Sequence, residues 1–261
     1  MHKERFLTLI EALGSYFRDS SNKEKIELFV EKAKNENAWF SDYLIRHAMA
    51  AIEEQFLTVG VWNHFFDKYP QSSNHKKSIG LILPGNLPAV GIHDVLMILA
   101  AGHELAIKLS SQDAALMRLY IDAIKSIDST YVLETVDRLS TVDAVIATGS
   151  DFSSAYFSNY FAKIPHIIRK NRSSVAILGG NENEADFQAL ADDIFTYYGL
   201  GCRNVSSISV PTNFDLTPLF DVLTKEEWVL DHTKYSNNYQ YHKTLLLLNQ
   251  IPHFDLGNLI V

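Results

Sequence analysis

The spacing of apolar residues changes once along the chain, near residue 70. Before that point apolar side chains recur every three or four positions, as Phe6, Ile10 and Leu13 do, which is the spacing of amphipathic helices. Beyond it, short apolar runs such as Ser78–Leu83 and Leu105–Leu109 are each followed by a helical pattern. Apolar strands that alternate with helices are typical of a parallel sheet covered on both faces. The sequence therefore predicts an α/β fold with a parallel Rossmann-type sheet.

The same alternation continues to about residue 210, and residues 211–261 have a mixed pattern. The alternation predicts strands at Ala144–Ala147, Ser173–Leu178 and Val205–Val210, and a helix that ends near Tyr198. The last four residues, Asn258–Val261, also have the apolar pattern of a strand. Because a strand is an unusual place for a domain to stop, we expect the chain to be truncated.

These changes of pattern predict three parts. Residues 1–70 form a helical N-terminal region, residues 71–180 a nucleotide-binding domain, and residues 181–261 an incomplete α/β catalytic domain.

Composition and charge narrow the class of protein. The chain is 47% hydrophobic and 21% charged, with a formal net charge of −8. An acidic chain is poorly suited to nucleic acid, which attracts basic surfaces, so we expect no nucleic-acid partner. No apolar stretch reaches the ~18–20 residues of a transmembrane helix. A single cysteine excludes an internal disulfide, and together these features indicate a cytoplasmic protein.

That single cysteine, Cys202, lies in an unusual place. It follows a predicted helix and a Gly-x-Gly turn, Gly199-Leu200-Gly201, and precedes a cation, Arg203. A structural cysteine is more often found inside an apolar element, whereas a neighbouring cation favours the nucleophilic thiolate. Both interpretations, a catalytic thiol and an inert one, stay open at this point. The histidines show no metal-ligand spacing, and we expect no metal site.

Polar residues follow three of the predicted strands. Asn86 in the turn Pro84–Pro88 is suited either to hydrogen-bond an oxyanion or to satisfy turn geometry. Lys108, with the hydroxyls of Ser110 and Ser111, suits a ribose or its phosphate. A Gly149-Ser150 turn precedes a predicted helix, whose N-terminal amides favour phosphate. Each signal is weak alone, and the chain has no GxGxxG fingerprint.

Taken in order, these segments resemble the aldehyde dehydrogenase superfamily, and more closely the acyl-CoA reductases of the LuxC family. The likeness runs from roughly residue 75 to residue 261 and rests on several motifs in matching order. They are Gly85-Asn86-Leu87-Pro88, Lys108-Leu109-Ser110-Ser111, Ala147-Thr148-Gly149-Ser150, His166-Ile167-Ile168-Arg169-Lys170-Asn171-Arg172, Leu178-Gly179-Gly180 and Gly199-Leu200-Gly201-Cys202-Arg203-Asn204-Val205.

The resemblance implies a role for each motif residue. Cys202 would be the nucleophile and Asn86 the oxyanion donor. NAD-preferring members of the superfamily often have a glutamate three residues after the lysine; here Ser111 stands there, so NADPH is favoured and NADH is the alternative. The cofactor-binding residues would be Lys108, Ser110, Ser111, Gly149, Ser150 and Gly179.

One departure from the superfamily concerns water. Hydrolytic aldehyde dehydrogenases have Glu-Leu-Gly-Gly where this chain has Ile177-Leu178-Gly179-Gly180. An isoleucine cannot act as the general base that activates water against an acyl-enzyme. Thiol exchange and hydride transfer remain available, which agrees with the resemblance to acyl-CoA reductases.

The expected activity is NAD(P)H-dependent reduction of a fatty acyl-CoA, or of an acyl-protein, to the aldehyde, with coenzyme A as part of the substrate. The resemblance also implies a homo-oligomer and an acyl-transferring synthetase as a partner. Two alternatives stay open. One is an oxidative aldehyde dehydrogenase, CoA-acylating or not. The other is a truncated module that binds nucleotide without catalysis.

Overall fold

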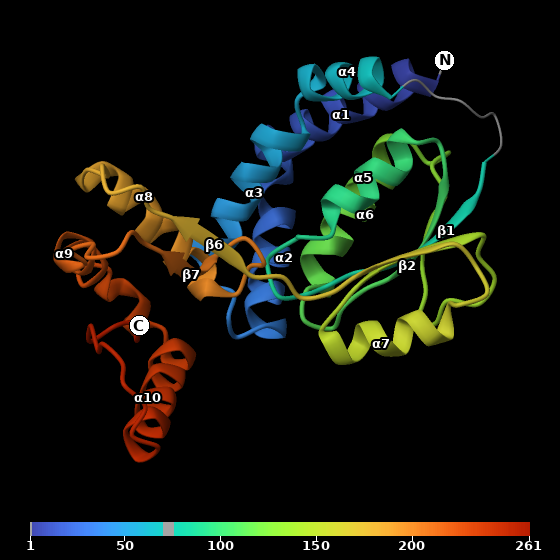
Figure 1. Cartoon of the computed structure of the whole chain (residues 1–261). Helices are drawn as coiled ribbons and strands as arrows, with labels where there is room; N and C mark the ends of the chain where they lie inside the picture. The colour runs from blue at the N-terminus through green and yellow to red at the C-terminus, as the bar shows by residue number, and fades with distance from the viewer. Residues whose placement is uncertain (1, 70–75) are drawn as a thin grey trace. The chain divides into compact units, whose positions relative to one another are not determined.

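The computed structural model describes residues 2–69 and 76–261, and the chain divides into two compact units between Asn171 and Arg172 (Figure 1). The expected boundary between residues 70 and 71 lies outside the described residues. The N-terminal helices belong to the first unit, and the second unit begins at Arg172, ahead of the expected boundary at 180.

The first unit begins with helices, as the apolar spacing predicts. Their apolar stripes are buried: Phe6, Ile10 and Leu13 are all fully inaccessible to solvent. These stripes pack in one hydrophobic cluster with the strands and helices that follow. The N-terminal elements are α1 (His2–Arg18), the short 3-10 helix η1 (Ser20–Asn22), α2 (Lys23–Glu36), α3 (Asp42–Phe56) and α4 (Val59–Lys68).

Five parallel strands follow and form one sheet in the order β3-β2-β1-β4-β5. The apolar runs predict β1, β2 and β4, which are confirmed, but not β3 and β5. β3 is three residues long with two of them exposed, and β5 is an edge strand without a buried residue, so neither has the apolar pattern of a central strand. The strands are β1 (Ser78–Ile82), β2 (Glu104–Lys108), β3 (Leu133–Thr135), β4 (Ala144–Thr148) and β5 (His166–Arg169).

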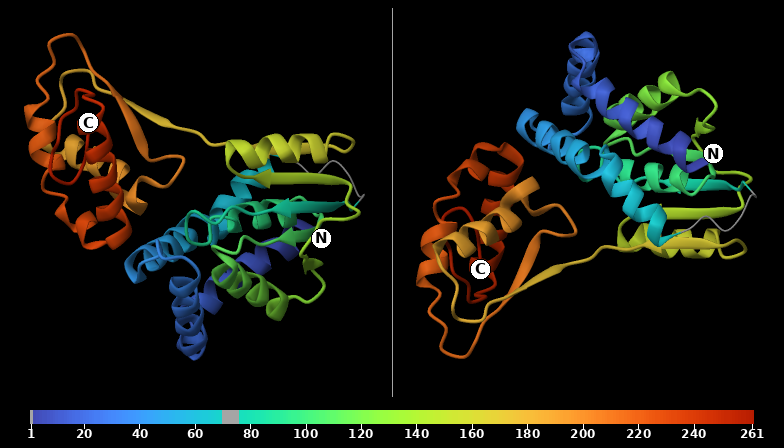
Figure 2. Two further views of the ribbon diagram at one scale, coloured as in Figure 1. Left: turned by 90° about the horizontal axis from the view of Figure 1, so that it is seen from below. Right: turned by 90° about the horizontal axis from the view of Figure 1, so that it is seen from above.

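Helices cover both faces of this sheet (Figures 1 and 2). On one face α5 (Ile92–Ala100) and α6 (Ala114–Ile127) share the large hydrophobic cluster of the N-terminal helices. On the other face the cluster under α7 (Asp151–Tyr160) contains Val145 and Ala147 of β4. The predicted doubly covered parallel sheet is confirmed.

The second unit is smaller and contains a two-stranded parallel sheet of β6 (Ser174–Ile177) and β7 (Val205–Ser209). One face of this sheet packs on the cluster of α8 and α9 through Ala176, Val205 and Ile208, whereas Val175 and Ile177 on the other face of β6 are exposed. The helical elements are α8 (Glu184–Phe195), η2 (Thr196–Gly199), α9 (Thr217–Leu223), η3 (Glu227–Asp231) and α10 (Thr233–Leu248).

The predicted strand at Asn258–Val261 is wrong. Asp255 and Ile260 form an isolated antiparallel bridge around a turn that contains Gly257, whose φ is 88°. These apolar residues instead close a short hairpin, and Leu256 and Leu259 pack against the second unit's core. None of the described helices has the length and apolar character needed to cross a membrane.

Candidate active site

Six of the predicted site residues lie at one edge of the first unit's sheet. β1 runs between β2 and β4, and Ile82 at its end pairs with Lys108 on one side and Ala147 on the other. The residues that follow these strands therefore meet at the carboxyl edge. The chain runs from β1 through β2 to β3 on one side and then crosses to β4 and β5 on the other, so the strand order reverses beside β1. Ligands of doubly wound folds bind at such a point. The residues gathered at this edge are Asn86, Lys108, Ser110, Ser111, Gly149 and Ser150.

The turn that carries Asn86 packs directly on the serine segment. A Cβ atom at Gly85 would lie 2.3 Å from the Ser110 Oγ, so only glycine fits here. On the other side of the turn the buried Asn37 amide donates a 3.1 Å hydrogen bond from Nδ2 to the Gly85 carbonyl. Asn86 itself is exposed. The exposed amide therefore stands on a turn whose backbone is held from both sides.

A buried acid lies under the same turn. Asp113 precedes α6 and is fully inaccessible, yet its side chain does not cap that helix. Glu36 of α2 accepts the Ala115 N–H instead, at 2.8 Å. Neither carboxyl oxygen of Asp113 has a hydrogen-bond partner among the described residues. Burial raises the pKa of Asp113 well above its ordinary value, the nearby N–H of Ala89 offsets part of the rise, and the charge of Glu36 adds to it.

A cavity of about 290 Å³ opens on the α7 side of the sheet next to Lys108. The Lys108 Nζ donates a 2.6 Å hydrogen bond to the Asp137 carbonyl, which holds the ammonium group at the cavity wall. Arg138 provides a second cation, and the rings of Tyr156 and Tyr160 provide aromatic walls. Cations beside aromatic faces suit a phosphorylated aromatic ligand.

The Gly149-Ser150 turn begins α7. Ser150 caps the helix by accepting the Ser153 N–H at 3.3 Å, and a Cβ atom at Gly149 would lie 2.9 Å from the Ser153 Cβ. The glycine therefore lets the strand turn closely into the helix. The turn places a helix N-terminus at the same sheet edge as Lys108.

An ion pair joins the edge strand β5 to α5. Arg169, from the basic run of the resemblance, donates from Nη1 to the Asp94 Oδ2 at 2.5 Å. Burial alone would raise the pKa of Asp94, but the hydrogen bonds from His93 and Arg169 outweigh it and lower the pKa. Arg169 thus has a structural partner within the first unit.

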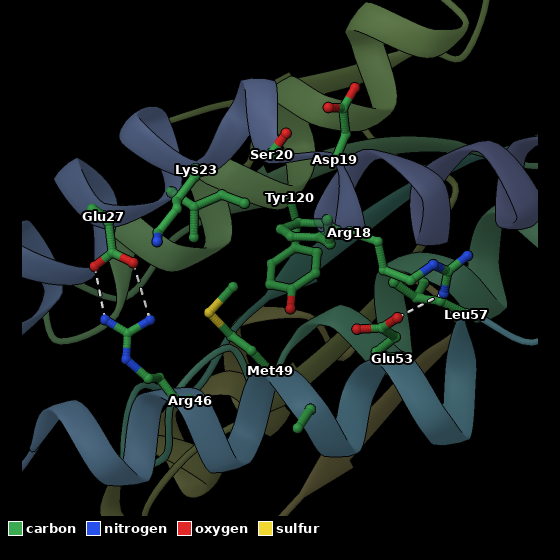
Figure 3. A pocket seen from close by; sticks show the side chains of 13 residues that line it. Arg18, Asp19, Ser20, Lys23, Glu27, Arg46, Met49, Glu53, Leu57 and Tyr120 are labelled. Carbon is green, nitrogen blue, oxygen red and sulfur yellow. Dashed lines mark hydrogen bonds and ion pairs between the residues drawn. The ribbon is translucent and has the colours of Figure 1, made fainter.

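A second cavity, of about 450 Å³, lies among the N-terminal helices and contains none of the predicted site residues (Figure 3). Its floor includes Tyr120. Its opening is flanked by two ion pairs, Arg46 with Glu27 at 2.7 Å and Arg18 with Glu53 at 2.6 Å. These pairs neutralise the charged groups at the opening, so they leave little charge to select a charged ligand.

In the second unit Cys202 lies at the tip of a β-turn. The Asn204 N–H donates to the Gly201 carbonyl at 3.0 Å, which closes a four-residue turn with Cys202 and Arg203 at its centre. Both central side chains are exposed. The backbone N–H of Cys202 has no hydrogen-bond partner in the part of the chain that the structure describes. The turn thus presents a thiol and an adjacent backbone donor.

The approach to this turn is conformationally strained. Tyr197 and Tyr198 have φ values of 55° and 56°, in the left-handed region that costs an ordinary residue about 1–2 kcal/mol. Such a conformation persists only where packing enforces it. The Tyr198 ring lies 4.4 Å from the His232 ring and 5.6 Å from the Trp228 ring, between centroids. This aromatic cluster fixes the reversal that leads from α8 to Cys202.

The glycine turn after β6 is closed by its own chain. The N–H groups of Gly179 and Gly180 donate to the two carboxylate oxygens of Glu182, at 2.5 and 2.9 Å. These bonds lower the pKa of Glu182, that from Gly179 most. Gly179, expected to bind cofactor, therefore has its N–H engaged within the turn. Ile177 is 82% exposed at the end of the strand.

Several residues in these two places went unnoticed at the level of sequence. Asn37 follows α2 and Asp113 precedes α6, and nothing in the sequence distinguishes either from a solvated polar residue. Arg138 follows β3, which the apolar pattern does not predict. Asn204 had a signal, because an Asn two positions after a cysteine can close a turn. The described residues contain no group of acids, histidines and cysteine that could hold a metal.

Comparisons with known proteins bear on the fold. No protein-family model matches the sequence, and no curated protein matches it. Solved structures do match. Aldehyde dehydrogenase C of Pseudomonas syringae, a mutant in complex with NAD⁺ and octanal, has a TM-score of 0.66 at 16% identity over 86% of this chain and 50% of its own.

Two further structures agree. The NAD⁺ complex of a Bacillus cereus aldehyde dehydrogenase has a TM-score of 0.65 at 18% identity over 86% of this chain and 50% of its own. An NAD-dependent benzaldehyde dehydrogenase of Corynebacterium glutamicum has 0.65 at 16% identity, over 86% and 54% respectively. The expected aldehyde-dehydrogenase-like fold is confirmed, and the chain spans about half the length of these relatives.

Proposed function

We propose that this chain is an acyl thioester reductase, which reduces an acyl-CoA or acyl-protein to the aldehyde with NADPH as the reductant. The observation that carries the proposal is the exposed thiol of Cys202, held on a turn beside its own backbone N–H, which bonds to no other group among the described residues. A nucleophile next to a hydrogen-bond donor is the arrangement that acyl transfer requires.

The acyl-transfer step follows from these groups. The Cys202 thiolate attacks the thioester carbonyl carbon and forms a new C–S bond. The Asn86 amide and the Cys202 N–H are the proposed donors to the carbonyl oxygen as it becomes an oxyanion. Collapse of the tetrahedral species breaks the C–S bond to coenzyme A, which leaves as a thiolate and takes up a proton. The acyl group then resides on the Cys202 sulfur.

The cavity beside Lys108 supports a cofactor that has a phosphate and an aromatic base. Lys108 and Arg138 supply two cations, and Tyr156 and Tyr160 supply ring faces. Ser111 carries no charge to repel a 2′-phosphate, and in the cavity lining the two cations outnumber the one acid, Asp137, so NADPH is preferred to NADH. Ser110, Gly149 and Ser150 are proposed to contact the same cofactor. Gly179, which belongs to the second unit, is proposed as a further contact to it. NADPH supplies the hydride that reduces the acyl group.

The side chain at position 177 supports reduction over hydrolysis. Ile177 is largely exposed and carries no group that could take a proton from water. The acyl group on Cys202 is therefore attacked by a hydride or by a second thiol and not by water. Addition of hydride and a proton gives a thiohemiacetal, which releases aldehyde and regenerates the thiol.

Steady-state turnover tests the proposal. The purified chain is given a series of acyl-CoAs with NADPH or NADH, and coenzyme oxidation, free coenzyme A and aldehyde are measured. Equal amounts of the three, faster with NADPH, support the proposal. Activity only from aldehyde with oxidised coenzyme, dependent on coenzyme A, would establish the oxidative alternative. Coenzyme binding without turnover in either direction would indicate a non-catalytic module and contradict the proposal.

A further inference from the structure

Asn204 joins the Cys202 turn to the end of α8 through both ends of its side-chain amide. The Oδ1 accepts the Gly201 N–H at 2.7 Å, one residue before the cysteine. The Nδ2 donates to the Asp193 and Thr196 carbonyls, each at 2.8 Å. The Asn204 backbone N–H donates in addition to the Gly201 carbonyl. One side chain therefore fixes the turn internally and attaches it to the helix.

The carbonyls that Asn204 contacts belong to the last turn of α8 and to the reversal after it. Carbonyl groups at a helix C-terminus lack partners within the helix and attract donors. Tyr197 and Tyr198 turn the chain back at this point with positive φ, so helical hydrogen bonding cannot continue. The Asn204 Nδ2 supplies the missing donors, and no other side chain among the described residues bonds to these carbonyls.

Ser174 holds the turn from the other side. Its Oγ donates to the Cys202 carbonyl at 3.2 Å from the start of β6. The cysteine's own carbonyl and the N–H of the residue before it are therefore both engaged, while its thiol and its own N–H remain available to a substrate.

We propose that Asn204 is a positioning residue for Cys202, one that holds the thiol and the adjacent backbone N–H in the geometry that acyl transfer needs. The inference rests on the proposed function of Cys202 and extends it to a residue that does not touch the substrate. Both the donor and the acceptor of the amide are required, so an isosteric carboxylate cannot replace it.

Two substitutions separate hydrogen bonding from size. Asn204→Asp keeps the shape and the acceptor for Gly201 but loses both Nδ2 donors and places negative charge against carbonyl oxygens. Asn204→Ala loses all the side-chain contacts. We expect each to slow acylation of Cys202 by an acyl-CoA about 10- to 100-fold, the scale expected from a small misplacement of a reacting group. Alkylation by iodoacetamide needs no oxyanion donor, and we expect it to change less than about threefold.

The matched control is Asn249→Ala. Asn249 lies in the same unit and donates from Nδ2 to the Leu245 carbonyl at 2.7 Å, near the end of α10. Its loss should change neither rate. Rates are compared at a temperature where every variant is folded. If Asn204 only stabilised the fold, its loss would change the acylation rate and the alkylation rate together, because both would follow the fraction of unfolded protein. Acylation by both Asn204 variants at the wild-type rate would overturn the proposal.

Amide hydrogen exchange of the wild-type chain tests whether Asn204 holds the turn. It needs neither a substrate nor a variant that must fold. The Gly201 N–H should exchange slowly because it is bonded to Asn204. Exchange at the rate of a solvent-exposed amide would overturn the proposed clamp. If the wild-type chain takes no acyl group from any acyl-CoA while Gly201 is protected, the proposed function fails and the clamp stands.

Discussion

The two units hold their candidate functional residues in different ways. In the first unit, Lys108 ends β2, and Asn86 and Ser150 follow the adjacent strands β1 and β4 of the same parallel sheet, which a large buried core fixes. In the second unit, Cys202 stands on one β-turn, held by Asn204 and by an aromatic cluster around Tyr198. Strand pairing therefore places the proposed binding groups of the first unit, whereas a few side-chain hydrogen bonds hold the turn that presents the thiol.

The largest expected effect separates the two units by function. Cys202→Ser should lower NADPH-dependent turnover by at least about 10³-fold, because removal of a covalent nucleophile abolishes the acyl-enzyme. NADPH affinity should stay within about twofold, since Lys108 and the cavity beside it belong to the first unit. Turnover and coenzyme fluorescence on binding are measured on the same preparation. A variant that retains most of its rate would exclude the covalent mechanism.

A smaller effect tests whether the first unit also takes part in the chemistry. Asn86→Ala should slow acylation of Cys202 about 10²-fold through loss of an oxyanion donor, and leave NADPH affinity unchanged. The control is Asn22→Ala, since Asn22 is an amide of the same unit that donates to the Tyr16 carbonyl. Single-turnover acylation is the measurement. An unchanged rate would assign Asn86 to turn geometry alone.

A third substitution restores a carboxylate to the second unit. Ile177→Glu should raise the yield of free acid several-fold, because a glutamate there can activate water against the acyl-enzyme. Val175→Glu is the matched control, since Val175 lies two residues before Ile177 on the same exposed face of β6. Acid and aldehyde are quantified together. Acid from both variants, or from neither, would contradict the role assigned to position 177.

The smallest effect concerns stability of the first unit. The folded-state pKa of Asp113 is raised by burial, so its contribution to stability is present below about pH 4 and is lost as pH rises through the raised pKa. Asp113→Asn removes this ionisation. The variant should therefore gain stability over the wild type as pH increases, by denaturant unfolding from about pH 4 to about pH 8.

Asp122→Asn, an exposed acid on the same helix, is the control for Asp113→Asn and should show no such trend. A stability difference for Asp113→Asn that shrinks with rising pH would have the wrong sign and would contradict the buried neutral acid.

Sequence patterns predict one of these regions better than the other. The apolar runs identify β1, β2 and β4, and strand ends alone then place Asn86, Lys108 and Gly149 at one sheet edge. They do not identify β3, which has one buried residue, or β5, which has none. Arg138 was missed for that reason, since it follows β3.

The turn around Cys202 follows less directly from sequence. The Gly-x-Gly segment indicates a turn before the cysteine, and in the structure Cys202 lies exposed on a β-turn. The positive φ values of Tyr197 and Tyr198 could not be predicted, because they depend on packing against Trp228 and His232 from a later segment. The bonds of Asn204 to Asp193 and Thr196 likewise depend on where α8 ends. Local propensity carries no information on such contacts.

The most direct test of acyl transfer to Cys202 is intact-mass spectrometry of the chain after incubation with a series of acyl-CoAs, without reductant or added thiol. We expect a mass gain equal to the acyl group, located on Cys202 and lost when NADPH is added. No adduct with any acyl-CoA, from a chain that still binds NADPH, would contradict the proposed acyl transfer.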